Sequence, residues 1–102
     1  MKARFEIRVS EGVKQDLQEL RAYDRQMILE AMGTQLMYAP NVATNNRKLL
    51  RNLTPPFEAI PPIWQLRVGG LRGFYDVQEA ERRVTIRAIR RKPAHRTTEE
   101  IL

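Results

Sequence analysis

The sequence has no cysteine and only one histidine. Without cysteine the chain cannot form disulfide bonds or thiolate metal sites, and one histidine is too few for a histidine-rich metal site. No apolar run is long enough to span a bilayer, and residues 1–12 lack the apolar segment of a secretory signal. We therefore expect a cytoplasmic protein without metal, cofactor or membrane contact.

The chain is also too short for two ordinary domains. Its 102 residues, 42% of them hydrophobic, are enough for one small apolar core. We therefore predict a single domain over residues 1–102.

Acidic residues are scarce in the later part of the chain. Residues 1–38 contain six Lys or Arg and six Asp or Glu, whereas residues 39–102 contain twelve basic and six acidic residues, which accounts for the whole net charge of +6. Between Arg82 and Arg96, seven of fifteen residues are basic and none is acidic. Such a one-sided field attracts phosphate backbones. The alternative is a solvated basic face that serves solubility.

The first third of the chain shows one strand pattern and two helix patterns. Phe5, Ile7 and Val9 alternate with charged residues, as in a half-buried strand. Ser10 has the chemistry of a helix N-cap, and the apolar residues after it recur at helical spacing. We predict a strand over Ala3–Val9, a helix over Glu11–Arg21 and a second helix over Arg25–Met37.

Asp24 has the side chain of an N-cap for the second helix, and the short link Ala22–Asp24 predicts an antiparallel helix hairpin. Three of the four methionines lie in this helix. We interpret them as core residues, the alternative being a soft apolar stripe for a partner helix.

Prolines interrupt regular structure between residues 39 and 62. Arg47–Leu50 matches a brief strand, but Asn52–Pro62 contains four prolines, which exclude a regular helix or a central strand. We predict an irregular loop there, either a functional lid or contact arm or an insertion without function.

Three segments between Trp64 and Arg91 alternate apolar and polar residues. They read WQLRV, GGLRGFYDV and RRVTIRAIRR, and the Gly69–Gly70 pair suits a tight turn that requires a positive φ. In strict alternation, one face of the sheet carries four arginines without matching carboxylates: Arg67, Arg72, Arg87 and Arg91. Because such a face repels itself, we interpret it as a surface that binds a polyanion.

The other face of these strands is apolar, and the helix hairpin is available to cover it. Its predicted members are Trp64, Leu66, Val68, Leu71, Tyr75, Val77, Val84, Ile86 and Ala88. The sequence therefore predicts an α+β fold with an N-terminal strand, a helix hairpin and then a mostly antiparallel sheet of three to four further strands.

The run W-Q-L-R-V-G-G-L-R-G-F-Y-D-V over Trp64–Val77 resembles a signature of the RelE/ParE superfamily of bacterial toxins. In the family, the run W-R-L-R-V-G-x-Y-R-x-x-Y-x-V is followed by a strand and a basic tail, which here reads R-K-P-A-H-R over Arg91–Arg96. Lys48-Leu49 resembles the family's K-L motif, and the order of elements agrees along nearly the whole chain.

This resemblance implies a RelE-like fold and the toxin of a type II toxin–antitoxin module. In the RelE-like nuclease branch, which we favour, such a toxin enters the ribosomal A site and cleaves mRNA without a metal ion, which inhibits translation. The implied partners are a cognate antitoxin, in a toxin–antitoxin hetero-oligomer, and mRNA on the ribosome.

The resemblance also assigns site residues. Arg72 and Arg91 fall where the family has phosphate-stabilising arginines, Arg67 falls at a position that is often basic, and His95 lies close to the tail residue that acts as acid or base. These four residues form the implied catalytic set. The implied RNA-binding set consists of Lys48, Arg87, Lys92 and Arg96.

Two departures from the family pattern leave its branch open. Gln65 occupies a position that is often basic in nuclease members, and Leu71 replaces a frequent tyrosine. No general base stands out, Glu58 being an outside candidate, and a lone histidine such as His95 is otherwise an incidental surface residue. The alternative function is that of a non-catalytic ParE-type toxin, which inhibits DNA gyrase. The tail Thr97–Leu102 is a short helix, a segment ordered by the antitoxin, or disordered.

Overall fold

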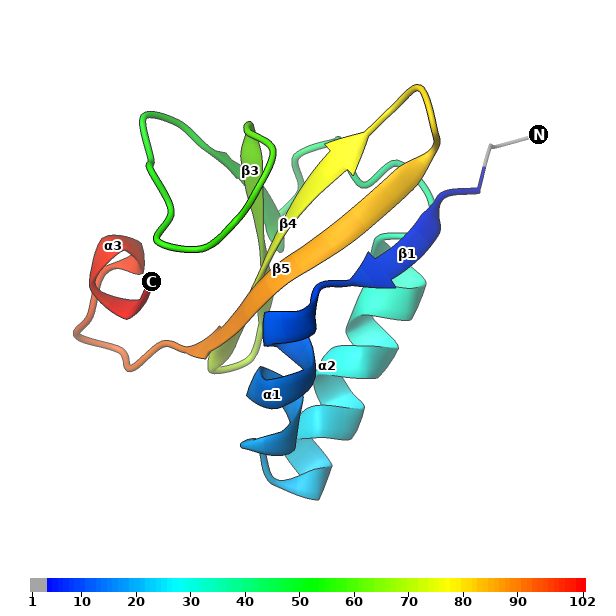
Figure 1. The fold of residues 1–102 in the computed structure, drawn as a ribbon. Coiled ribbons are helices and arrows are strands. Elements are labelled where there is room, and N and C mark those ends of the chain that lie inside the picture. Colours follow the sequence, from blue (N-terminus) through cyan, green and yellow to red (C-terminus); the bar gives the residue numbers. More distant parts are fainter. Residues whose placement is uncertain (1–3) are drawn as a thin grey trace.

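The computed structural model describes residues 4–102, which form a five-stranded sheet flanked by helices (Figure 1). In chain order the elements are β1 (Glu6–Val9), α1 (Glu11–Gln18), α2 (Ala22–Gln35), β2 (Arg47–Leu50), β3 (Ile63–Val68), β4 (Leu71–Gln78), β5 (Arg83–Arg91) and α3 (Thr98–Ile101). The predicted α+β fold is confirmed. The predicted first strand began at Ala3, which lies outside the described residues.

Five strands form the sheet in the order β1-β5-β4-β3-β2. β1 runs parallel to β5, and all other neighbours are antiparallel. The turn between β3 and β4 is the predicted Gly69–Gly70 pair, in which Gly69 has a φ of +57°, a backbone conformation that costs little only for glycine. Because this turn is tight, the residues that flank it on β3 and β4 lie side by side.

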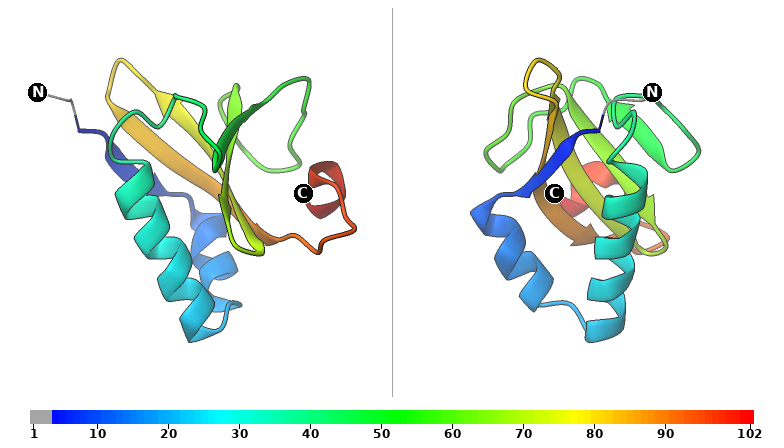
Figure 2. Two further views of the ribbon diagram at one scale, coloured as in Figure 1. Left: turned by 180° about the vertical axis from the view of Figure 1, so that it is seen from behind. Right: turned by 90° about the vertical axis from the view of Figure 1, so that its right-hand side faces the viewer.

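The helices α1 and α2 cover one side of the sheet, which we call the helix face (Figure 2). Val13 of α1 and Ile28 and Met32 of α2 are buried there against strand residues. Met27 also packs against this core, so both methionines serve the predicted packing role. Within residues 4–102, no helix has the length and apolar character needed to cross a membrane.

The first helix is shorter than predicted. It ends at Gln18, three residues before the predicted end. The Arg25 guanidinium donates hydrogen bonds of 2.8 Å to the main-chain carbonyls of Leu17 and Leu20. The carbonyl of Leu17 also accepts a 3.2 Å bond from the N–H of Leu20, so the carbonyl groups at this helix end are satisfied without a further helical turn.

The second helix begins earlier than predicted. Its N-cap is Arg21 and its first residue is Ala22, so Asp24 is not the cap and Ala22–Asp24 is not the link between the helices. Those two predictions are wrong. Asp24 lies in the first turn of α2, where a carboxylate interacts favourably with the helix dipole. It is almost fully buried and pairs with Arg91 of β5 at 2.7 Å and with Arg21 at 3.5 Å.

A β-bulge reverses the alternation along β5. Phe74 lies opposite Ala88, while the next residue of β4 lies opposite Ile86, so Arg87 is the extra residue on β5. Beyond it, Ile89 belongs to the core on the helix face and Ala88 to the cluster on the opposite face. The prediction of Ala88 on the helix face is therefore wrong, whereas the other eight predicted residues are in that core.

The opposite side of the sheet, which we call the second face, is covered by the loop of residues 51–62 and by α3 (Figures 1 and 2). The loop has no helix or strand, as predicted. The tail forms a short helix, one of its three predicted alternatives, and Thr97 begins that helix with a capping box. The packed residues on this face are Leu50, Phe57, Ala59, Ile63, Phe74, Ala88, Ile101 and Leu102.

A buried ion pair attaches the loop of residues 51–62 to the second face. The carboxylate of Asp76 on β4 is fully buried and accepts a 2.8 Å hydrogen bond from Nε of Arg87. The same carboxylate accepts a 2.7 Å bond from the main-chain N–H of Ile60 in the loop. Because buried charges must be paired and hydrogen-bonded, this arrangement holds the loop in place.

Candidate functional site

A small basic pocket lies on the second face, beside the β3–β4 turn. Its volume is about 210 Å³. The residues that line it come from β2, β3, β4, the start of α3 and the segments before β2 and after β5: Asn45, Asn46, Lys48, Gln65, Arg67, Arg72, Lys92 and Thr98. Four of these eight side chains are cationic, and among the residues that the structure describes, none that lines this pocket is a carboxylate. We call this site the basic pocket.

Strand register pairs four of these side chains, three of which are cationic. Arg67 of β3 lies directly opposite Arg72 of β4, and Lys48 of β2 lies opposite Gln65 of β3. Since side chains alternate between the two faces along a strand, Gln65 and Arg67 share the second face. The three cations therefore come from three adjacent strands.

The facing arginines have unfavourable electrostatics. Like charges directly opposite each other on neighbouring strands destabilise a sheet. The pKa of Arg72 is lowered, first by burial of its guanidinium and then by the charge of Arg67. Nη1 of Arg72 donates 2.8 Å hydrogen bonds to the carbonyls of Gly69 and Leu71, whereas its buried Nε has no partner among the described residues. An anion in the pocket would offset this repulsion.

The segment before β2 holds Arg67. The main-chain N–H of Arg67 donates a 2.7 Å hydrogen bond to the carbonyl of Asn46, and Nη2 donates a 3.2 Å bond to the carbonyl of Asn45. These two contacts fix one wall of the basic pocket against β3.

The segment after β5 forms the opposite wall. The main-chain N–H of Lys92 donates a 2.8 Å bond to the carbonyl of Gly70, which ties the end of β5 to the β3–β4 turn. The hydroxyl of Thr98 donates a 2.9 Å bond to Oε1 of Gln65, which is 7% exposed. Gln65 therefore links the start of α3 to the floor of the pocket.

The fold is similar to those of solved structures. A chain of the toxin–antitoxin complex RelBE2 from Mycobacterium tuberculosis matches with a TM-score of 0.72 at 18% identity, covering 88% of this chain and 93% of that one. A chain of the archaeal RelE–RelB complex from Pyrococcus horikoshii OT3 matches with a TM-score of 0.68 at 21% identity, covering 92% and 99%. The fold is RelE-like. No protein-family model and no curated protein matches the sequence.

In this RelE-like fold, four of the predicted site residues meet in the basic pocket. Arg67 and Arg72 come from the predicted catalytic set, and Lys48 and Lys92 come from the predicted RNA-binding set. The predicted concentration of positive charge on one face is therefore present, over a smaller area than the sequence indicated.

Arg91 lies on the other side of the sheet. It is opposite Leu71, a residue of the helix-face core, and Nη2 of Arg91 donates a 2.7 Å bond to Asp24 of α2. The prediction that Arg91 shares a face with Arg67 and Arg72 is wrong, because the bulge at Arg87 shifts every later side chain of β5 to the opposite face.

Both arginines of the predicted RNA-binding set have carboxylate partners. Arg87 lies on the second face, as predicted, but it pairs with the buried Asp76, so the predicted absence of a matching carboxylate is wrong there. Arg96 lies between β5 and α3 and contacts Glu100 at 3.2 Å. Neither arginine lines the basic pocket.

His95 is exposed, on the segment between β5 and α3. It is not a lining residue, but Lys92 and Thr98, each three residues away along the chain, both line the basic pocket. Glu58, the outside candidate for a base, lies beside Ser10 and Arg87 at another small cavity. Neither the histidine nor the glutamate lines the basic pocket.

Three lining residues were not predicted: Asn45, Asn46 and Thr98. The asparagine pair belongs to a turn-rich stretch of the sequence, which predicts a turn but does not indicate what the turn contacts. Thr98 precedes two glutamates in the tail, and its position depends on how the tail packs. The basic tail motif marked Lys92 in one wall, but no sequence pattern marked these three residues.

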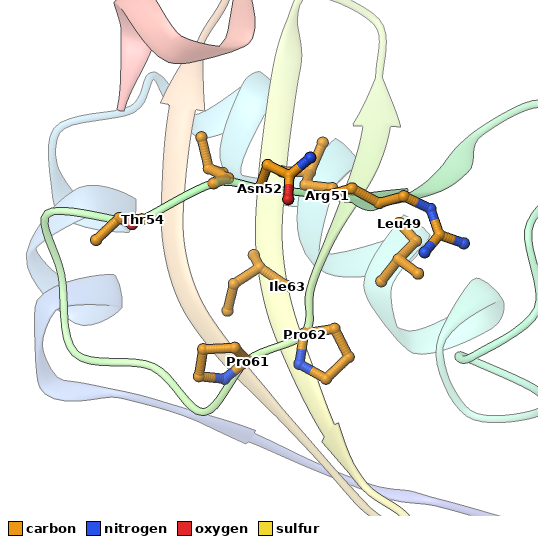
Figure 3. A pocket seen from close by; sticks show the side chains of 9 residues that line it. Leu49, Arg51, Asn52, Thr54, Pro61, Pro62 and Ile63 are labelled. Carbon is orange, nitrogen blue, oxygen red and sulfur yellow. The ribbon is translucent and has the colours of Figure 1, made fainter.

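A larger cavity, of about 650 Å³, lies where the loop of residues 51–62 leaves and rejoins the sheet (Figure 3). Pro61 and Pro62 form one side, residues 51–54 run along the other, and Ile63 lies between them. Among its lining residues within 4–102, Arg51 alone is cationic. It lacks the concentrated charge of the basic pocket, and we place the candidate site in the latter.

Proposed function

We propose that this protein is the toxin of a type II toxin–antitoxin module and that it inhibits translation as a ribosome-dependent, metal-independent mRNA endoribonuclease. The observation that carries the proposal is the basic pocket, in which four cations converge without a lining carboxylate. Arginine pairs of this kind suit phosphate oxygens, to which they donate charge-assisted hydrogen bonds.

The similar solved structures support the toxin role. One is a toxin–antitoxin complex, RelBE2, and the other is a RelE–RelB complex, and each match covers most of both chains. The fold alone does not specify an activity, so the nuclease assignment depends on the residues in the pocket.

RNA cleavage of this type has three chemical requirements. The ribose 2′-oxygen loses its proton and attacks the adjacent phosphorus, and the bond from phosphorus to the 5′-oxygen breaks, leaving a 2′,3′-cyclic phosphate and a 5′-hydroxyl. A base must accept the first proton, cations must stabilise the extra negative charge on the phosphorane, and an acid must protonate the leaving oxygen. The second requirement is the one that the basic pocket meets directly.

Each residue of the site has a proposed part in this reaction. Arg67 and Arg72 stabilise the phosphorane, since they stand opposite each other and both face the pocket. Lys48 and Lys92 bind the neighbouring phosphates. His95 is the proposed acid, because it belongs to the segment between Lys92 and Thr98, which both line the pocket. The general base comes from outside the pocket lining, with ribosomal RNA as the candidate source.

Primer extension on mRNA in a translating extract tests the proposal. The wild-type protein should generate new 5′ ends, whereas Arg67→Ala, Arg72→Ala and His95→Ala should reduce them by at least about tenfold, because each loses an interaction with the reacting phosphate. Arg72→Ala and His95→Ala should also relieve growth arrest in cells while remaining folded.

The matched control is Arg4→Ala. Arg4 is an exposed arginine ahead of β1, at the edge of the sheet opposite to β2. Its loss removes one positive charge without touching the basic pocket and should leave cleavage unchanged. If the pocket variants cleave as well as Arg4→Ala does, the site is wrongly placed.

The alternative function is inhibition of DNA gyrase by a ParE-type protein surface. One observation favours it: among the described residues, those lining the pocket include no histidine, tyrosine or carboxylate, and Gln65, which cannot titrate, is engaged by Thr98. A supercoiling assay separates the two functions. Inhibited supercoiling without new mRNA 5′ ends would replace the nuclease proposal with this one.

The proposed partner is a cognate antitoxin in a toxin–antitoxin hetero-oligomer. An acidic segment of that partner would neutralise the basic pocket and block access of phosphate to it. Co-purification of the toxin expressed from its native operon checks this. High salt should release bound RNA from the toxin more readily than it releases the antitoxin.

A further inference from the structure

The cations of the basic pocket do not account for sequence preference. Contacts to phosphate position a nucleic acid but carry no information about its bases. Base recognition therefore depends on the neutral groups of the pocket, which are Asn45, Asn46, Gln65 and Thr98. Gln65 and Thr98 are hydrogen-bonded to each other at 2.9 Å, so the two asparagines remain.

The asparagine pair is held rigidly at the pocket wall. Oγ1 of Thr44 accepts hydrogen bonds from the main-chain N–H groups of Asn46 at 3.2 Å and Arg47 at 3.1 Å, and the N–H of Thr44 donates to the carbonyl of Arg47 at 2.9 Å. This closed turn resembles those in which a Ser or Thr hydroxyl replaces a main-chain bond. The backbone carbonyls of the pair bind Arg67.

Both asparagines are exposed, and neither side-chain amide has a hydrogen-bond partner within the described part of the chain. Their backbone is thus fixed to a phosphate-binding arginine while their amides stay available. An amide presents a donor beside an acceptor. Every base has a complementary pair on its Watson–Crick edge, but on the Hoogsteen edge only adenine, with N6–H beside N7, offers one. Single-stranded RNA exposes these edges.

We propose that Asn45 and Asn46 are specificity-determining residues that recognise an adenine next to the phosphate bound by Arg67 and Arg72. This inference rests on the proposed function, since it deepens the substrate preference of the same pocket. Thr44 is a positioning residue for the pair, because its hydroxyl holds the turn.

Equilibrium binding of short oligoadenylate and oligouridylate, measured by fluorescence anisotropy, tests this without requiring catalysis. The wild type should prefer oligoadenylate by about fivefold or more, the effect of one good amide–adenine contact. Asn45→Ala combined with Asn46→Ala should bring the preference close to one, because affinity for oligoadenylate should fall more than affinity for oligouridylate. Thr44→Val, which keeps both amides, should reduce the preference in the same direction.

The possible outcomes separate this inference from the function on which it rests. Equal wild-type affinity for the two oligomers, or a preference that the asparagine variants keep, overturns adenine recognition and leaves phosphate binding standing. If the wild type binds neither oligomer, the phosphate-binding role of the pocket fails, and adenine recognition fails with it. Circular dichroism of each variant checks that the fold is retained.

Discussion

At the scale of single residues, Arg67 and Arg72 have the character of functional residues that cost stability. They are like charges on directly opposed strand positions, and the neighbouring charge adds to burial in lowering the pKa of Arg72. Nothing in the described pocket lining neutralises them. Proteins retain such arrangements where binding requires them.

Replacing Arg72 by methionine should therefore separate binding from stability. Arg72→Met keeps the aliphatic stem but removes the charge, so relief of repulsion offsets the lost hydrogen bonds to the carbonyls of Gly69 and Leu71. We expect the free energy of unfolding to stay within about 1 kcal/mol of wild type, while RNA affinity falls about tenfold or more. Urea unfolding and anisotropy measure the two quantities. A large loss of stability would make Arg72 a structural residue.

Arg87 shows the opposite character, although it also lies on the second face. It is largely buried and pairs with Asp76, whose carboxylate is fully buried and also binds the loop at Ile60. The same residue type thus binds a carboxylate of this chain at one position and is left without one in the basic pocket. The sequence does not distinguish Arg87 from the arginines of the basic pocket. The difference is that an acidic residue, Asp76, lies beside Arg87 on the neighbouring strand.

Removing Arg87 should destabilise the protein strongly. In Arg87→Ala the buried carboxylate of Asp76 loses its ion-pair partner, and breaking a buried pair from one side typically costs about 3–5 kcal/mol. Guanidinium unfolding measures this cost. Arg8→Ala is the matched control, since the Arg8–Glu6 pair is exposed and such pairs contribute about 0–1 kcal/mol. Equal effects of the two substitutions would contradict the structural role of Arg87.

At the scale of secondary-structure elements, the sequence predicted the strands. It did not predict which face of the sheet the side chains of β5 take beyond the bulge. Period-two alternation identified β3 and β4 and their inward faces, and it placed Arg67 and Arg72 together. The extra residue at Arg87 has no compositional signature, so alternation put Arg91 and Ala88 on the wrong faces. The walls of the basic pocket come from a turn and from the tail, whose packing depends on distant parts of the chain.

The contact between α2 and β5 should make stability depend on acidity. The pKa of Asp24 is lowered, mainly by the hydrogen bond from Arg91, which is 2.7 Å long. A carboxyl whose folded-state pKa lies below its unfolded value stabilises the fold fully above the unfolded value, about pH 4, and this contribution is lost as the pH falls through the folded-state pKa.

Urea unfolding as a function of pH checks this contribution of Asp24. Wild-type stability should decrease as the pH falls below about 4, and Asp24→Asn should show a shallower decrease over the same range because it has no carboxylate to protonate. Glu19→Gln, at an exposed carboxylate on the C-cap of α1, is the control and should follow the wild type. Identical pH profiles for wild type and Asp24→Asn would show that the Arg91 contact contributes nothing.

At the scale of the whole molecule, two sources of attraction for a polyanion must be told apart. The chain has a net charge of +6, spread over many exposed side chains, and four cations are concentrated in the basic pocket. A diffuse field accelerates encounter and raises non-specific affinity, whereas cations that contact phosphates release a defined number of counterions. Salt dependence of binding distinguishes them.

The salt dependence of affinity for single-stranded RNA should therefore follow the basic pocket. If its four cations each contact one phosphate, log affinity should fall against log salt with a slope of about −2.8, a loss of about 50-fold between about 50 and about 200 mM. Replacing both Arg67 and Arg72 by alanine should halve the slope to about −1.4, which leaves a loss of about sevenfold over the same range. Arg4→Ala lowers the net charge without touching the pocket and should keep the wild-type slope. Counterion release depends on contacts and not on total charge. If Arg4→Ala and each single pocket variant reduce the magnitude of the slope equally, the slope follows net charge alone, and binding belongs to the diffuse field.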